Sequence, residues 1–256
     1  MLEEKIVAEG MAGLKGRILA DVRIGLELLA VRLDDGRVGI TYVLRDELED
    51  VCQLLPEGGS LVGRRAEEVA SWFLLPGNVL KRALGLAVIN AEAGAGQNLA
   101  SGDATDFPGI LPGEKVGIVG KMGPIMSRVS QLGNSWTAFG REELRTRQRE
   151  ELPSCQVVFI TASALINGTL EEVLSSCTGA REVVLTGTST PLLPRAFSGT
   201  GVTLLAGTCW RAEEGEDLLA GVSQAATIRT LISKGRKTAL SVPPGRALQG
   251  NINMLS

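Results

Sequence analysis

Histidine is absent from this 256-residue chain, and its absence excludes the mechanisms that need an imidazole group. A Ser-His-Asp or Cys-His nucleophile cannot be assembled, and neither can a zinc motif that contains histidine. Acid–base chemistry would therefore have to use Asp, Glu, Lys, Tyr or Cys side chains, or bound water.

Cysteine is scarce, and the four residues, Cys52, Cys155, Cys177 and Cys209, are far apart in the sequence. They form no CxxC pair and no dense framework, so a reducing compartment is the simpler expectation. Each thiol can equally be a small buried apolar side chain.

The chain also lacks long hydrophobic runs and an excess of basic charge. No run approaches the ~20 apolar residues of a membrane span, and acidic residues stand where a secretory signal carries basic ones. Its 26 basic and 29 acidic residues are interspersed, so we expect no nucleic-acid partner. We expect a cytoplasmic protein without membrane insertion, and leave open whether it forms a homo-oligomer.

The hydrophobic content of 44% is sufficient for a full core, and the length favours two domains. In the first half, apolar spacing predicts a helix over 2–19, Asp34-Asp35-Gly36 predicts a hairpin turn, and further helices are expected over 64–73 and 77–93. This order is typical of an α+β domain. Periodicity is lost between Gln97 and Glu114, so we place a domain over 1–97, a connecting segment that could line a cleft over 98–114, and a second domain over 115–256.

The second half alternates short apolar strands with helices. Strands are expected over 115–120, 135–139, 157–162, 182–187 and 201–207, and a last helix over 213–234. Continuous apolar strands separated by helices indicate a parallel sheet covered on both faces. With right-handed crossovers this becomes a doubly wound, Rossmann-like α/β domain.

Polar side chains follow several of these strands where each strand ends. Thr161 and Asn167 lie in "VVFITASALINGTLEEVL", and Thr186, Thr188, Ser189 and Thr190 lie in "LTGTSTPLLP". The carboxyl ends of parallel strands meet at one edge of the sheet, where α/β proteins bind ligands. Two alternatives are structural: Asn167 can close an Asx turn, and Thr169 with Glu172 has the spacing of a capping box.

The segment "VGIVGKMGPI" carries Gly120 and Gly123, and Pro124 can occupy the first turn of the next helix. Such glycines let backbone NH groups approach an anion at a helix N-terminus. The GxxG spacing is only weak evidence for a dinucleotide, and a tight turn alone would also explain the glycines.

Other candidates lie outside the strand ends. Asn90 interrupts an apolar helical run, so its amide must find a partner or project into a cleft. Tyr42 and Arg45 could face the same cleft, although the tyrosine ring could simply pack with its hydroxyl in water. The acid–base candidates are at three positions, Asp103, Asp106 and Glu142. Glu142, like the neighbouring Glu143, follows the second strand, where nucleotide-binding folds place a ribose-binding acid, but mixed charge there also fits a solvated segment.

Four motifs in this order, "ALGLAVINA", "KVGIVGKMGPI", "VVFITASALINGTLEEVL" and "VVLTGTSTPLLP", resemble the family of "putative heavy-metal chelation" proteins from about Asp21 to Gly207. The resemblance implies an enolase N-terminal-like domain before a Rossmann-like one, with a site between them. The ligand-binding positions that it implies are Asn90, Gly120, Gly123, Pro124, Thr161, Asn167, Thr169, Ser189, Thr190 and Pro191. Two departures are Ala162 and Ala164, which replace a glycine and a hydroxyl residue.

The resemblance implies an activity proposed for the family: the condensation or hydrolysis of small heterocyclic molecules of the flavin, pterin or siderophore type, which would serve the handling of metals. We therefore expect an enzyme that acts on a small anionic or heterocyclic molecule. The alternatives are a non-catalytic binding module for a metal chelate, and a nucleotide- or methyl-donor-dependent enzyme. The cofactor is unknown, and a divalent or heavy metal is compatible with the family. Direct coordination of a metal by the protein is disfavoured because the chain has no histidine, although Asp103 and Asp106 offer oxygen ligands.

Overall fold

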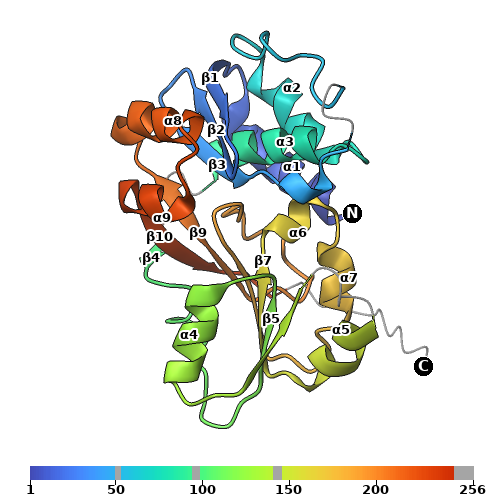
Figure 1. The fold of residues 1–256 in the computed structure, drawn as a ribbon. Coiled ribbons are helices and arrows are strands. Elements are labelled where there is room, and N and C mark those ends of the chain that lie inside the picture. The colour runs from blue at the N-terminus through green and yellow to red at the C-terminus, as the bar shows by residue number, and fades with distance from the viewer. Residues whose placement is uncertain (50–52, 94–98, 141–145, 245–256) are drawn as a thin grey trace, which may run out of the picture.

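The computed structural model describes residues 1–49, 53–93, 99–140 and 146–244. Within these residues the chain forms a three-stranded antiparallel sheet and a seven-stranded sheet that is mostly parallel, with helices around both (Figure 1). The predicted α/β fold class is confirmed. No helix in the described part of the chain is both long and apolar enough to cross a membrane.

The first half builds the small sheet and the helices that cover one of its faces. Its elements are α1 (Leu2–Leu14), β1 (Leu19–Ile24), β2 (Leu28–Leu33), β3 (Val38–Tyr42), η1 (Arg45–Glu47), α2 (Ala66–Ser71), η2 (Trp72–Leu74) and α3 (Val79–Glu92). The predicted hairpin is β2 and β3, and the two later helices are also confirmed. The first helix is shorter than predicted: it ends at Leu14, because Lys15 is extended with a ψ of 122° and Gly16 has a φ of 76°.

The second half builds the large sheet. Its elements are β4 (Ala100–Ser101), β5 (Val116–Val119), α4 (Gly123–Gln131), β6 (Trp136–Phe139), α5 (Thr146–Glu151), η3 (Leu152–Ser154), β7 (Val157–Thr161), α6 (Ser163–Ile166), α7 (Leu170–Ser175), β8 (Glu182–Thr186), β9 (Leu204–Trp210), η4 (Ala212–Glu214), α8 (Gly215–Ser223), α9 (Ile228–Leu231), η5 (Ile232–Lys234) and β10 (Gly235–Ser241). The spatial order is β4-β10-β9-β8-β7-β5-β6, in which β5 to β9 run parallel while β10 and β4 are antiparallel.

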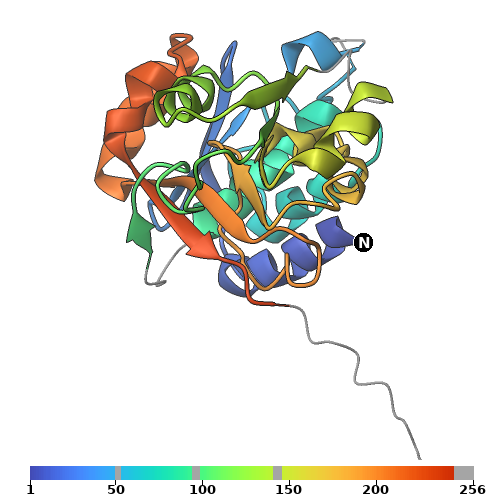
Figure 2. The ribbon, with the colours of Figure 1, turned by 90° about the horizontal axis from the view of Figure 1, so that it is seen from below.

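Helices cover both faces of the parallel strands, as the apolar runs predict (Figures 1 and 2). Alternate residues of a strand point to opposite faces. Phe159 therefore packs in the cluster that contains Ile125 and Val129 of α4, whereas Ile160 belongs to the cluster that contains Val173 of α7.

All five predicted strands are present, but the last predicted helix, over 213–234, is wrong. The chain leaves α8 at Ala225, whose φ of 60° lies in the left-handed region that a helix cannot continue through. A short α9 follows, and then the antiparallel strand β10, which the sequence analysis missed together with β4.

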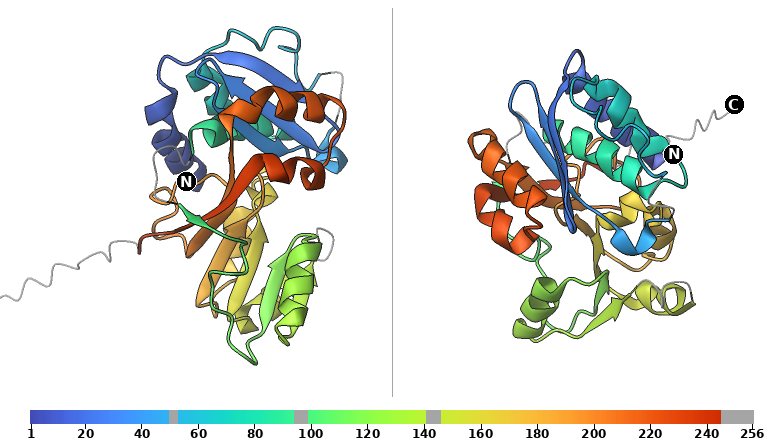
Figure 3. Two further views of the ribbon diagram at one scale, coloured as in Figure 1. Left: turned by 90° about the vertical axis from the view of Figure 1, so that its left-hand side faces the viewer. Right: turned by 45° about the horizontal axis from the view of Figure 1, so that its top comes forward.

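Segments from the two halves of the sequence interlock. The small sheet lies between α3 on one face and α8 on the other (Figure 3). The α8 side chains Leu218 and Val222 pack with Leu28 and Ile40 of the small sheet in one buried cluster. The division of the chain into 1–97, 98–114 and 115–256 stays a prediction. However, α8, from the last of these segments, covers one face of the small sheet, which belongs to the first.

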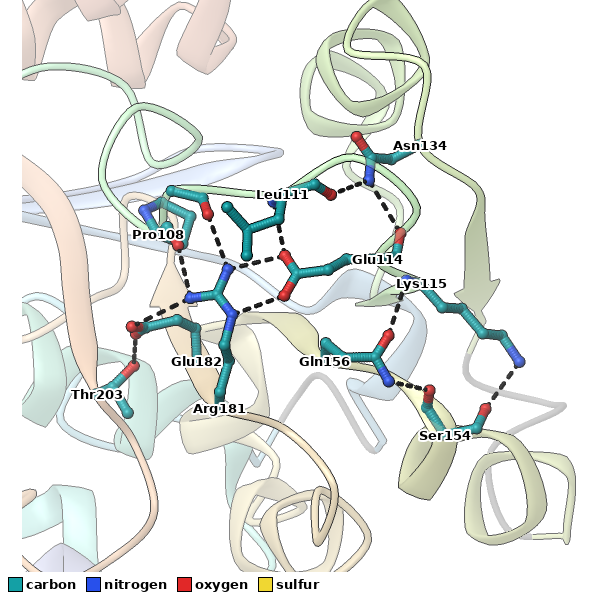
Figure 4. Close-up of polar contacts among 11 residues, drawn as sticks. Pro108, Leu111, Glu114, Lys115, Asn134, Ser154, Gln156, Arg181, Glu182 and Thr203 are labelled. Carbon is teal, nitrogen blue, oxygen red and sulfur yellow. Dashed lines mark hydrogen bonds and ion pairs between the residues drawn. The ribbon is translucent and has the colours of Figure 1, made fainter.

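The amino-terminal edge of the large sheet is held by a closed polar network (Figure 4). Arg181 donates to both carboxylate oxygens of Glu114, at 2.7 and 2.8 Å, and to the carbonyls of Pro108 and Gly109, at 3.0 and 2.8 Å. Asn134 donates to the carbonyls of Leu111 and Glu114. This network fixes the segment before β5 against the sheet.

Candidate functional site

The topology of the parallel strands marks one place for a ligand. Following the chain, β6 is added on one side of β5 and β7, β8 and β9 on the other, so the strand order reverses between β5 and β7. Open α/β sheets bind ligands outside the carboxyl ends of the strands at such a reversal. A cavity of about 560 Å³ lies there, and we call it the η1 cavity because η1 forms part of its wall.

Both halves of the chain line the η1 cavity. Gly120, Thr161 and Thr186 line it from the ends of β5, β7 and β8, and the segment from Tyr42 to Glu47 lines it from the small-sheet side. A neighbouring cavity of about 360 Å³, the α9 cavity, extends toward β9, β10 and α9. The residues common to both walls are Tyr42, Lys121, Met122, Thr186 and Gly187. We call the two cavities together the cleft.

Two glycines shape the wall that the strand ends provide. Gly120 and Gly187 have φ values of 108° and 118°, which side-chain-bearing residues rarely adopt. A Cβ on Gly120 would also lie 2.7 Å from Cγ2 of Thr161. The backbone therefore turns sharply after β5 and β8, and Gly123 and Pro124 then begin α4.

The charged side chains of the cleft differ between its two cavities. The η1 cavity is lined by the carboxylates of Glu27, Asp46 and Glu47 and by the cation of Arg45. The charged residues of the α9 cavity are Asp103, Lys121, Arg229 and Lys237, of which Asp103 and Lys237 form an ion pair at 2.6 Å. Lys121 lines both cavities.

Tyr42 lies where the two cavities meet. Burial raises the pKa of Tyr42, and the negative charge of Glu27 raises it further, although a hydrogen bond with Thr188 opposes the change. Its backbone NH donates to the Ser189 hydroxyl at 3.0 Å. The phenol therefore stays protonated at neutral pH and is available as a hydrogen-bond donor.

The structure places some of the predicted site residues in the cleft and others outside its lining. Those that line it are Tyr42, Arg45, Asp103, Gly120, Pro124, Thr161, Thr186 and Thr188, whereas Gly123 is absent from the lining of both cavities. Ser189, Thr190 and Pro191 are buried next to it in the chain segment after β8. Asp106 does not line it but accepts from the backbone NH of Asp103 at 2.8 Å. Glu142 and Glu143 lie outside the described residues.

Asn90 does not line the cleft. It lies on α3, where its Nδ2 donates to the carbonyl of Ile40 at 3.4 Å. Its Oδ1 is buried and has no hydrogen-bond partner among the described residues. Since Asn90 lines neither cavity of the cleft, its role in ligand binding stays a prediction.

Asn167 and Thr169 form a local turn. The Asn167 Oδ1 accepts from the backbone NH of Thr169 at 3.3 Å and from its hydroxyl at 2.8 Å. The capping box predicted for Thr169 and Glu172 is therefore wrong: the threonine makes no cap bond, and Glu172 pairs with Arg149 at 3.2 Å. Asn167 also donates to Glu47 at 3.1 Å and lines a separate cavity of about 450 Å³ on the other side of η1.

Sequence reasoning missed several charged residues of the cleft. Lys121 directly follows Gly120, so the glycine motif contained a signal for it. Glu27 comes from the turn between β1 and β2, and Arg229 from α9. These two reach the cleft only because α8 and α9 pack beside the small sheet, and no local pattern reveals that arrangement.

The donor groups of the described residues do not fit a protein-bound metal. No three His, Cys, Asp or Glu side chains in the described ranges lie close enough together to hold an ion. Burial raises the pKa of Cys155 and Cys209, and raises that of Cys177 to about 12. Thiolate, the form that binds soft metals, is thus disfavoured at these three positions.

Comparison with known proteins gives a consistent pattern. A family model described as "Putative heavy-metal chelation" (DUF364) matches residues 103–241, and a second with the same description (DUF4213) matches residues 7–93. A protein of unknown function from the DUF364 family of Pyrococcus horikoshii superposes with a TM-score of 0.78 at 24% identity, over 94% of this chain and 100% of that one. A second, from Desulfitobacterium hafniense DCB-2, gives 0.72 at 20% identity, over 93% and 98%. These similarities show a shared fold, and no curated protein matches the chain.

Proposed function

We propose, from the premise that this chain belongs to the "Putative heavy-metal chelation" family, that it binds a small anionic or heterocyclic molecule in the cleft. Flavins, pterins and siderophore-type compounds are the classes that we expect. The reaction that we propose is a condensation or a hydrolysis that serves the handling of heavy metals.

The observation that carries this proposal is the position of Lys121. Its side chain is exposed, directly follows β5 at the reversal of strand order and lines both cavities. No ion pair involves it in the described part of the chain. An unpaired cation in a concave site attracts an anion, and the N-terminus of the nine-residue helix α4 adds backbone NH donors nearby.

The cleft also contains groups suited to proton transfer. Condensation and hydrolysis each need one group that accepts a proton and one that donates it. The carboxylates of Glu27 and Asp46 are acceptors, and Tyr42, whose pKa burial raises, is a donor. Asp103, the acid–base candidate from the sequence that does line the cleft, is neutralised by Lys237 and is a weaker choice.

A thermal-shift screen tests the binding proposal. The purified protein is mixed with flavins, pterins, nucleotides, a methyl donor and divalent metals, each alone and in combination, because a ligand of the native state raises apparent stability. We expect a shift with an anionic heterocycle that disappears in Lys121→Met. The matched control is Lys115→Met, at the opposite end of β5, which removes the same charge and should retain the shift.

Two outcomes would contradict the proposal. One is an equal loss of the shift in both variants, because the two lysines lie at opposite ends of the sheet. The other is a shift with metals alone that Lys121→Met leaves unchanged. Mass analysis of a ligand recovered after incubation then tests catalysis: an altered mass supports an enzyme, and an unchanged ligand supports the alternative of a binding module for a metal chelate.

A further inference from the structure

The short helical turn η1 forms a wall between two cavities. Its residues Asp46 and Glu47 line the η1 cavity on one side and the separate cavity of about 450 Å³ on the other. The residues that flank the turn, Leu44 and Leu48, pack against the main core and fix its two ends. The polar side chains between them lie outside that core, so their orientation depends on polar contacts.

Asn167 supplies such a contact from the other half of the chain. It directly follows α6, and its Nδ2 donates to Oε1 of Glu47 at 3.1 Å. At the same time its Oδ1 accepts from the hydroxyl of Thr169 at 2.8 Å and from the backbone NH of Thr169 at 3.3 Å. One side chain therefore connects η1 to the turn that follows β7 and α6.

The two contacts of Asn167 determine which residue type can make them. A backbone NH such as that of Thr169 can only donate, and the carboxylate of Glu47 can only accept. An asparagine amide offers one acceptor and one donor, and the two partners also fix which way the amide points. An aspartate would keep the contact with Thr169, but its second oxygen would repel Glu47.

The turn that carries Asn167 is fixed by a buried arginine of the first half. Arg82 of α3 donates to the carbonyls of the last two residues of α6, both at 2.7 Å, and pairs with Glu3 at 2.9 Å. Its side chain is only 9% exposed, so water screens these bonds little. Asn167 is therefore held by contacts that do not involve Glu47, and it can impose an orientation on that carboxylate.

We infer that Asn167 is a positioning residue of the cleft, which orients the carboxylate of Glu47 in the wall of the η1 cavity and joins η1 to the turn after α6. Asn167 then acts on a ligand through Glu47 and not by direct contact. The inference rests on the proposed function, because the η1 cavity is part of the cleft in which we place the ligand.

Reversing the direction of the hydrogen bond tests the inference. Asn167→Asp keeps the acceptor for Thr169 and sets two carboxylates against each other. Adding Glu47→Gln restores the bond in the opposite direction, from the glutamine amide to the aspartate. The matched control adds Glu49→Gln to Asn167→Asp, which gives the same net charge. Glu49 is exposed and lines the 450 Å³ cavity, but it is not the residue that accepts from Asn167.

Hydrogen exchange over residues 43–49, followed by mass spectrometry, reports how firmly η1 is held when no ligand is present. The probes are the backbone NH groups of Glu47 and Leu48, which donate within the turn at 2.9 and 3.2 Å. We expect their protection to fall about tenfold in Asn167→Asp, the effect of losing one hydrogen bond to a charged group. The reversal variant should recover it, the control should not, and Glu47→Gln alone should lose little because its amide oxygen still accepts.

Two results would overturn the inference. One is wild-type protection in Asn167→Asp, and the other is equal protection in the two double variants, because charge and not the bond would then matter. If Asn167→Asp does not fold, circular dichroism of the double variants decides: a folded reversal variant beside an unfolded control supports the bond. The same outcome in both would place the role of Asn167 in its turn with Thr169.

Calorimetric titration of pterin-6-carboxylate into the same variants separates this inference from the proposed function. We expect the dissociation constant to rise about tenfold in Asn167→Asp and in the control, and to recover in the reversal variant. If exchange shows the recovery but binding is the same in all variants, η1 is held by Asn167 without affecting the ligand, and the positioning role is wrong. If the wild type does not bind the compound at about 1 mM, the proposed function is contradicted, whereas exchange still decides whether Asn167 holds Glu47.

Discussion

Polar side chains at the amino-terminal ends of the parallel strands, the amino edge, differ from those at the carboxyl-terminal ends, the carboxyl edge. At the amino edge Arg181 is bonded to a carboxylate and two carbonyls, and Asn134 and Gln156 are bonded to backbone groups (Figure 4). At the carboxyl edge, within the described residues, Lys121 has no ion pair and the Thr186 hydroxyl has no partner. Side chains that satisfy one another hold the fold, whereas unsatisfied ones in a cavity are available to a ligand.

We expect the largest loss of stability from a substitution at the amino edge. Arg181→Met should lower the free energy of unfolding by about 1 to 2 kcal/mol, because Glu114 and two carbonyls lose a charged donor that is itself partly exposed. Lys121→Met, at the carboxyl edge, should change it by less than about 0.5 kcal/mol. Denaturant unfolding of both variants measures the difference, and equal losses would erase the distinction between the edges.

The pH dependence of the stability loss in Arg181→Met tests whether the bond between Arg181 and Glu114 causes it. Hydrogen bonds from Arg181, the largest cause, hold the pKa of Glu114 below its ordinary value of 4.5, against the opposing effect of burial. A lowered folded-state pKa contributes stability above the unfolded-state pKa, and this contribution is lost as the pH falls through the folded value. The gap of about 1 to 2 kcal/mol between wild type and Arg181→Met should thus be constant near neutral pH and shrink below pH 4.5. A gap that does not change on acidification would mean that the carbonyl bonds alone produce it.

Two threonines allow the same comparison for single hydroxyl groups, one toward each edge. Thr203, toward the amino edge, donates to Glu182 at 2.5 Å and accepts from the NH of Val183 at 3.0 Å, whereas the Thr190 hydroxyl is buried with no partner in the described ranges. Thr203→Val should lower the free energy of unfolding by about 1 kcal/mol, and Thr190→Val should leave it unchanged or raise it by about 0.5 kcal/mol. Thermal unfolding of both variants gives the two signs. A loss in Thr190→Val would mean that its hydroxyl has a partner, such as an ordered water.

Local patterns predicted the parallel strands well and the margins of the fold poorly. Strands β5 to β9 are continuous apolar runs, so their positions could be read from the sequence. Strand β10 has only two fully buried residues among seven, because it lies between β9 and the two-residue β4 near the sheet edge. Its sequence therefore carries neither a buried run nor a clear alternation.

Some residues of the cleft could likewise be predicted from the sequence, and others could not. Gly120 and Thr161 could be placed because they end strands, and the ends of parallel strands converge. Glu27 and Arg229 could not, because their positions depend on contacts between residues about 200 apart, such as the 3.2 Å bond from Ile228 to Glu27. Asn167 shows the limit of a short motif: one pattern fits both a ligand contact and the turn that it makes with Thr169.

The smallest predicted effect concerns Tyr42, the only tyrosine, whose ionisation can be followed by near-ultraviolet absorbance without interference from another phenol. Burial, and after it the charge of Glu27, raises the pKa of Tyr42. Glu27→Gln keeps an oxygen that can accept from Ile228 but removes the charge, so the pKa should fall part of the way toward 10.0, the ordinary value. Glu213→Gln, an exposed change outside the cleft lining, should leave it unchanged. Because Glu27 lines the η1 cavity and Tyr42 lines both cavities, a shift would show that the charge of a carboxylate in the cleft wall acts on the phenol. If Glu27→Gln leaves the tyrosine pKa unchanged, solvent screens the charge of Glu27 as it would at a surface, and burial alone raises the pKa of Tyr42.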